Sequence, residues 1–126
     1  MAHNLVVEDN PEINELICEV LESHHVYPTY SGTEALLVFQ MKKIDLVILD
    51  IMLSGKSGAE VLQEIRQTSF VPIIILTALG SKQKVSEFLL NDANDYITKP
   101  FDFDELQARV TVQLRAFQPP IQETFA

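Results

Sequence analysis

Residues 44–50 read Ile-Asp-Leu-Val-Ile-Leu-Asp, a nearly unbroken apolar run that ends in an aspartate. Such a run, rich in β-branched residues, is typical of a strand that is buried on both faces, as strands are in parallel sheets. In open parallel sheets, ligands bind just beyond the carboxyl ends of the strands. The stretch therefore predicts a central strand and places Asp50 at the edge where a functional site is expected.

The rest of the chain alternates short apolar runs with segments of helical periodicity. Strictly alternating strand and helix units build a parallel sheet with helices on both faces. We therefore predict one α/β domain with a single doubly wound, five-stranded parallel sheet. Strands are predicted at residues 5–7, 26–29, 44–49, 71–76 and 95–98, and helices begin near Pro11, Ser31, Ser57, Ser81 and Asp102.

Local signals support several of these elements. Asn10 is a favourable N-cap and Pro11 suits the first helical position, and the apolar spacing that follows includes Leu16 on the buried stripe. Residues 31–34 and 57–60 both have the Ser-x-x-Glu pattern of a capping box. Pro28 cannot donate to a strand ladder, so residues 26–29 are predicted to form an edge strand.

Composition limits the class of protein. The chain has 126 residues, 47% of them hydrophobic and 21% charged, which is typical of one globular domain. Its net charge of −9 argues against binding of nucleic acid or an anionic membrane by this chain alone. There is no apolar run long enough to span a bilayer and no secretory signal. Cys18 is the single cysteine, which excludes an internal disulfide and favours a cytoplasmic location.

Polar residues stand at the ends of four predicted strands: Glu8 and Asp9, Asp50, Thr77 and Lys99. If the sheet order is 2-1-3-4-5, three carboxylates share one cleft, and they repel one another unless a cation intervenes. Mg²⁺ typically takes one or two carboxylates and shares its coordination shell with a phosphate. Each residue alone could be an ordinary polar loop group, but together they indicate a site that handles phosphoryl groups.

The proposed chemistry at this site needs no general base. Asp50 is already ionised and can attack phosphorus directly. A metal ion, the Lys99 ammonium and the Thr77 hydroxyl would stabilise the negative charge on the transferred group.

The motifs LVVEDN at 5–10, DLVILDIMLSGKSG at 45–58, PIIILTA at 72–78 and ANDYITKPFDFDEL at 93–106 together resemble the receiver domain of bacterial response regulators, over residues 4–117. This resemblance implies the flavodoxin-like strand order 2-1-3-4-5. It also implies a phosphorelay role in two-component signalling. Such a domain accepts a phosphoryl group from a sensor histidine kinase and is a switch that assists its own phosphorylation and dephosphorylation, not an enzyme.

The resemblance assigns roles to residues of the metal and acceptor site. Asp50 resembles the phosphorylated aspartate and Asp9 the direct Mg²⁺ ligand, with Glu8 acting mainly through water. The backbone carbonyl of Met52 would be a further ligand. Met52 and Leu79 occupy the two positions that influence hydrolysis of the acyl phosphate in this family, and both are apolar. We therefore expect a long-lived phosphorylated form.

The remaining roles concern the switch. Thr77 resembles the hydroxyl that turns towards the phosphoryl group, and Tyr96 resembles the aromatic residue that changes rotamer with it. Lys99 resembles the lysine that pairs with the phosphate, and the bond from Lys99 to Pro100 is expected to be cis.

The end of the chain is most similar to receivers that precede winged-helix DNA-binding domains. Those receivers form homodimers on phosphorylation through the face made by the fourth helix, fifth strand and fifth helix. The residues that would form this dimer face are Lys84, Val85, Leu89, Asp95, Glu105 and Arg109. The resemblance implies a charge pair between chains from Asp95 and Arg109, and Lys84 with Glu105 could make another.

We expect residues 1–117 to form the receiver and residues 118–126 to be a tail or the start of a linker, because two prolines interrupt this segment. The chain is then either a stand-alone receiver or a fragment, and any DNA binding belongs to an absent output domain, which we expect to regulate transcription.

Three rival functions would each require different residues at this edge of the sheet. A flavin carrier would need a Ser/Thr/Gly-rich loop where Glu8-Asp9-Asn10 stands, and an aspartyl phosphatase usually needs an aspartate where Met52 stands. A pseudo-receiver would not need the intact set of strand-end residues.

Overall fold

The computed structural model describes residues 2–53, 55–78 and 92–117. Within them, five parallel strands form one sheet in the order β2-β1-β3-β4-β5, which confirms the predicted order. The strand that follows β1 in the chain is added on one side of it, and the later strands are added on the other. The order of strands therefore reverses between β1 and β3, which is the topological switch point. The strands are β1 (His3–Val7), β2 (His25–Thr29), β3 (Leu46–Asp50), β4 (Ile73–Ala78) and β5 (Asp95–Lys99).

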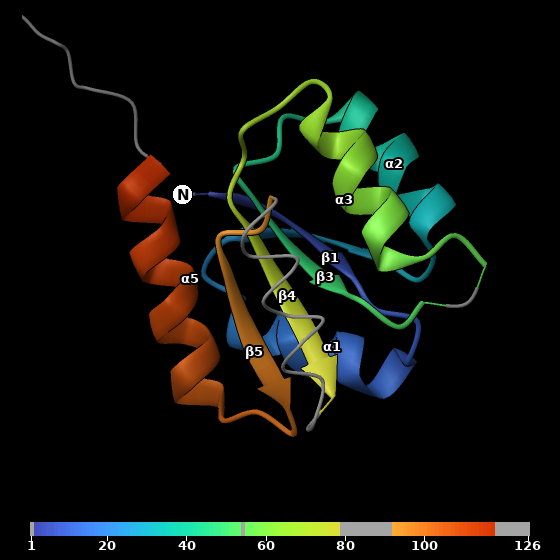
Figure 1. Cartoon of the computed structure of the whole chain (residues 1–126). Coiled ribbons are helices and arrows are strands. Elements are labelled where there is room, and N and C mark those ends of the chain that lie inside the picture. The colour runs from blue at the N-terminus through green and yellow to red at the C-terminus, as the bar shows by residue number, and fades with distance from the viewer. Residues whose placement is uncertain (1, 54, 79–91, 118–126) are drawn as a thin grey trace, which may run out of the picture.

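Helices cover both faces of this sheet. In Figure 1, α2 and α3 lie on one face, and α1 and α5 lie on the other. The helix expected to begin at Ser81 lies outside the described residues. None of the helices described here has the length and apolar character needed to cross a lipid bilayer. The helices are α1 (Pro11–Val20), α2 (Gly32–Met41), α3 (Gly58–Arg66) and α5 (Phe103–Phe117).

Two strands are displaced along the sequence from their predicted ranges. The strand expected from Ile44 begins at Leu46, and the strand expected from Val71 begins at Ile73. Ile44 and Val71 are buried, but the regular ladder of pairs begins later, with Val47 opposite Ile73. An apolar residue indicates that its position is buried, but a strand begins only where the neighbouring strand supplies hydrogen-bonding partners.

At their carboxyl ends, β4 and β5 extend further than predicted. Thr77 pairs with Thr98, and Ala78 pairs with Lys99. The polar residues at these strand ends therefore belong to the sheet itself and not to the loops beyond it. A site built on strands is held more rigidly than a site built on loops.

The central strands are buried on both faces, as their composition predicts. Residues Leu46 to Asp50 of β3 are all buried. Alternate side chains enter two cores, one with Val61, Leu62 and Ile65 of α3, and one with Ile17 and Leu21 on the α1 side. Two core layers fix the register, because a slip by one residue would exchange the two sets of side chains.

The helix caps agree with the sequence signals in two cases and differ in one. Asn10 accepts hydrogen bonds from the backbone N–H groups of Glu12 and Ile13, so α1 has the predicted N-cap. At α3, Ser57 and Glu60 form the complete capping box. At α2, Ser31 accepts from the Glu34 N–H, but the Glu34 carboxylate accepts from Tyr30 N and not from Ser31 N. The box predicted at residues 31–34 is therefore only half formed, because Glu34 reaches one residue further back.

The buried stripe of α1 also differs from the prediction. Leu16 is 39% exposed, whereas Asn14 is fully buried. The face that packs on the sheet runs through Asn14, Ile17 and Leu21, at helical spacing. Hydrophobicity alone placed Leu16 on this face and missed the buried amide.

Candidate functional site

The three acidic residues predicted to converge do so in the folded chain. Glu8, Asp9 and Asp50 each offer a carboxylate oxygen, and these oxygens lie within 4.8 Å of one another. Glu8 and Asp9 directly follow β1, and Asp50 is the last residue of β3. Because β1 and β3 are neighbours at the switch point, their carboxyl ends bring the three acids to one edge of the sheet.

Lys99 joins this cluster from the end of β5. Its Nζ lies 2.6 Å from Glu8 Oε1 and 2.9 Å from Asp50 Oδ2. Burial, the largest single influence, lowers the pKa of Lys99, but its contacts with Glu8 and Asp50 outweigh it, and the pKa is raised above its ordinary value. The bond from Lys99 to Pro100 is cis, as predicted.

Glu8 is the most deeply buried acid of the cluster, with a side chain only 1% exposed. Burial raises its pKa, although the contacts with Lys99 and with the backbone of Asn10 oppose that shift. Oε2 accepts a hydrogen bond from Asn10 N at 3.0 Å. Oε1 is also buried, and its partner is the Lys99 ammonium, 2.6 Å away.

This donor set fits a hard divalent cation. Three carboxylates carry more negative charge than one lysine can neutralise, and oxygen ligands are those that Mg²⁺ prefers. The number and the chemistry of these donors therefore fit a cation site.

Asp50 is held in place from two sides. It is 4% exposed, Oδ1 accepts from Met52 N at 2.9 Å, and Oδ2 accepts from Lys99 Nζ at 2.9 Å. The Met52 side chain is 68% exposed, so it contributes little to the buried part of the site. Leu79, predicted to act with Met52, lies outside the described residues.

The two predicted switch residues are on β4 and β5. Thr77 is buried, and its hydroxyl donates to the carbonyl of the adjacent Ala78 at 3.4 Å. Tyr96 is half-buried and packs against the core on the α2 and α3 side. Thr77 therefore lies on the strand next to β3, which carries Asp50, and Tyr96 lies on β5, one strand further away.

The residues of the predicted dimer face that the structure describes form ion pairs with one another within the chain. Arg109 Nη1 lies 2.9 Å from Asp95 Oδ1, and Arg109 Nε lies 3.2 Å from Glu105 Oε2. Lys84, Val85 and Leu89 lie outside the described residues. The predicted charge pair between Asp95 and Arg109 thus exists in a single chain, and its use between chains stays a prediction.

Sequence analysis missed two residues that shape the site. A Cβ atom on Gly58, the first residue of α3, would lie 2.5 Å from the Asp50 carbonyl oxygen and 2.7 Å from Ile51 Cα. The buried amide of Asn14 donates to the Glu8 carbonyl. Asn14 could have been noticed, because it is a polar residue three and seven positions before the buried Ile17 and Leu21. The close backbone contact at Gly58 has no sequence signature beyond the glycine itself.

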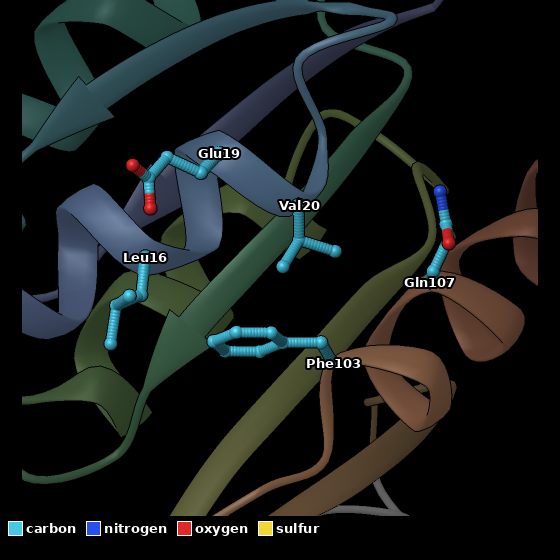
Figure 2. A pocket seen from close by; sticks show the side chains of 5 residues that line it. All are labelled: Leu16, Glu19, Val20, Phe103 and Gln107. Carbon is cyan, nitrogen blue, oxygen red and sulfur yellow. The ribbon is translucent and has the colours of Figure 1, made fainter.

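A pocket between α1 and α5 lies apart from this cluster. Figure 2 shows Leu16 and Phe103 facing one another across it, and both side chains are partly exposed. None of the acidic cluster residues lines it. Leu16 of α1, which was predicted to face the sheet, thus borders a surface groove and not the sheet core.

Comparison with known proteins adds independent findings. Residues 5–111 match the family model of the response regulator receiver domain. The chain is 42% identical over 116 residues to the regulatory protein VanRc of Enterococcus gallinarum, and 46% identical over 115 residues to the transcriptional regulatory protein YrkP of Bacillus subtilis. Each alignment covers 90% of this chain but 50% and 49% of the relative, so the chain spans about half the length of these curated relatives.

Solved structures agree with this assignment. The receiver domain of a Francisella response regulator superposes with a TM-score of 0.88 at 30% identity, covering 94% of this chain and 100% of that one. A response regulator receiver domain protein from Clostridium thermocellum gives a TM-score of 0.85 at 28% identity, covering 92% and 96% of the two chains.

Proposed function

The chain belongs to the response regulator receiver family of two-component signalling, and from that premise we propose that Asp50 is its phosphoryl acceptor. The observation that carries this proposal is the position of Asp50 among Glu8, Asp9 and Lys99 at the end of β3. An ionised carboxylate there can act as a nucleophile without a general base.

In the proposed reaction, one Asp50 carboxylate oxygen forms a bond to phosphorus as the bond between phosphorus and the donor's leaving group breaks. Lys99 Nζ, already 2.9 Å from Asp50 Oδ2, balances charge on the phosphoryl oxygens, and the Thr77 hydroxyl can turn to donate to them. Glu8, Asp9, Asp50 and the Met52 carbonyl would hold Mg²⁺. When bound, the ion neutralises charge on the acids and on the incoming phosphoryl group.

The whole protein's partners follow from the family. We expect a sensor histidine kinase to supply the phosphoryl group, and an output domain beyond a receiver of residues 1–117 to act on DNA, because the relatives include transcriptional regulatory proteins of about twice this length. Residues 118–126 would begin the connection to it. The cytoplasmic location stays a prediction, as does the role of a switch that assists its own phosphorylation and dephosphorylation.

Incubation with acetyl phosphate and Mg²⁺ is expected to add the mass of one phosphoryl group to the wild-type chain. Asp50→Asn removes the nucleophile and should abolish the gain, whereas Asp104→Asn, at an exposed position on α5, should leave it unchanged. Intact-mass spectrometry, with EDTA as the metal-free arm, checks both. No gain by the wild-type chain, or an undiminished gain by Asp50→Asn, would contradict the proposal. The same samples, followed after removal of the donor, test the predicted long lifetime, which loss within seconds would refute.

Phosphorylation is expected to promote a homodimer through β5, α5 and the helix predicted from Ser81. The Asp95–Arg109 ion pair is partly exposed and can exchange partners between chains at little cost, since surface ion pairs contribute about 1 kcal/mol or less. Sedimentation velocity with and without beryllofluoride and Mg²⁺ measures this, with Arg109→Gln as the test variant. A monomer that persists at high concentration in both conditions would count against it.

A further inference from the structure

The amide of Asn14 lies directly behind the acidic cluster, and the proposed function does not use it. Asn14 is fully buried on the face of α1 that packs against the sheet. An apolar residue here would continue the stripe of Ile17 and Leu21. Burial of an amide costs free energy unless its hydrogen bonds are made, so the bonds that Asn14 makes indicate its role.

Both hydrogens of the Asn14 amide are used. Nδ2 donates to the Glu8 carbonyl at 3.0 Å and to the Thr29 carbonyl at 2.9 Å. The Thr29 carbonyl also accepts from Glu8 N at 3.1 Å. On the other side of the amide, Oδ1 accepts from Cys18 Sγ at 3.4 Å. Asn14 thereby joins α1, the end of β2 and the segment that follows β1.

These bonds act on the backbone of the acidic pair. The Glu8 carbonyl belongs to the peptide unit that connects Glu8 to Asp9. Because a peptide unit is planar, fixing its oxygen also fixes the directions in which the Cα atoms of both residues leave it. Thr29 holds the preceding N–H of Glu8. The main chain is thus anchored from α1 and β2, while both carboxylates point to the cluster with Asp50.

We propose that Asn14 is a positioning residue for the cation site, and that its amide holds the Glu8–Asp9 peptide unit in the orientation that presents both carboxylates to Mg²⁺. This inference rests on the proposed function, which requires that cation. The hydrogen bonds of Asn14 go to two main-chain carbonyls and to Cys18, so it acts on the carboxylates through the main chain. Loss of a group that orients metal ligands typically weakens metal affinity by about 10–100-fold.

The test is a titration of the purified chain with Mg²⁺ alone, followed by amide NMR shifts, with thermal unfolding measured in parallel. Asn14→Leu keeps the approximate size of the side chain but removes the donor, and it is expected to weaken Mg²⁺ binding about tenfold. Asn14→Ser retains one donor and should bind with an intermediate affinity.

Asn94→Leu is the matched control, because it removes an amide by the same substitution at the opposite end of the sheet. Its Oδ1 accepts from Ile73 N at 2.9 Å and from Arg66 Nη2 at 2.8 Å. This variant should lose thermal stability while keeping the wild-type Mg²⁺ affinity. A purely structural role for Asn14 predicts that its variants behave in the same way as Asn94→Leu.

The outcomes separate the two claims. If the wild-type chain binds Mg²⁺ and Asn14→Leu is less stable but binds it equally well, the positioning role is overturned and the proposed function stands. If Asn14→Leu does not fold, unchanged Mg²⁺ affinity in Asn14→Ser overturns the role instead. A wild-type chain that binds no Mg²⁺ overturns both claims.

Discussion

Gly58→Ala is expected to lower the free energy of unfolding by about 3 kcal/mol, the upper part of the usual range for overpacking a buried position. The added Cβ would lie 2.5 Å from the Asp50 carbonyl oxygen and 2.7 Å from Ile51 Cα. Both are backbone atoms, which cannot move aside as a side chain can. Either α3 moves away from the sheet or the end of β3 shifts. Urea denaturation of the wild type and the variant measures the loss.

The same variant should slow phosphorylation, because Asp50 is the residue whose carbonyl is displaced. Gly55→Asn is the control: Gly55 has φ of +75°, and a Cβ there meets no atom within 4 Å. Asparagine tolerates the left-handed region, so this substitution should cost well under about 1 kcal/mol. Equal stability of Gly58→Ala and the wild type would show that α3 adjusts freely and would contradict the prediction.

Lys99→Met is expected to destabilise the metal-free chain by about 2 kcal/mol at neutral pH, within the range for hydrogen bonds to charged groups. The substitution removes the cation that lies between Glu8 and Asp50 and leaves two buried carboxylates beside each other. Lys56→Met is a matched control, because Lys56 forms an equally short ion pair with Glu64 on the surface. That pair is exposed and screened by solvent, so Lys56→Met should destabilise the chain far less than Lys99→Met.

The pH dependence of this loss follows from the two shifted groups. The pKa of Lys99 is raised, so the stability from its ion pairs is present below its ordinary value of 10.5 and is lost as pH rises through the raised value. The pKa of Glu8 is raised by burial, so its ionisation opposes folding as pH rises from 4.5 through that raised value. Without Lys99 this opposition grows. The difference between wild type and Lys99→Met should therefore be largest near neutral pH and shrink in acid and above pH 10.5.

Urea unfolding in EDTA across this pH range checks the prediction. Glu8→Gln combined with Lys99→Met should recover part of the loss, because the neutral amide removes one of the two carboxylates. Similar losses in Lys99→Met and Lys56→Met would show that the buried lysine contributes no more than a surface one.

The parallel sheet and its polar edge could be predicted because both depend on patterns that the sequence carries, whereas the strand order that brings the acids together was implied by the family resemblance. Alternating apolar runs dictate a parallel sheet, and the residue that ends each run must lie at the same edge. The position of Asp50 after its buried strand is such a case. Strand limits were less predictable, since Ile44 and Val71 are as apolar as the strands but precede the ladder.

The details of the site depend on contacts between residues distant in the chain. Nothing in the sequence shows that Lys99 bridges Glu8 and Asp50 before any phosphoryl group is present. The Asp95–Arg109 pair also forms within one chain, where the sequence resemblance implied a pair between two. Electrostatic partners are decided by distance, and distance is a property of the folded chain.

By itself, the sequence determined the fold class and the identity of the residues at the acceptor edge, because hydrophobic periodicity and the geometry of parallel sheets act locally and repeat along the chain. The strand order was implied by the family resemblance. Only the tertiary structure decided that Asn14 faces the sheet in place of Leu16, that α3 approaches β3 closely enough to require Gly58, and that Lys99 shares two buried acids. Those features arise from the packing of elements against one another, where a rotation of a helix by a fraction of a turn exchanges the residues that meet.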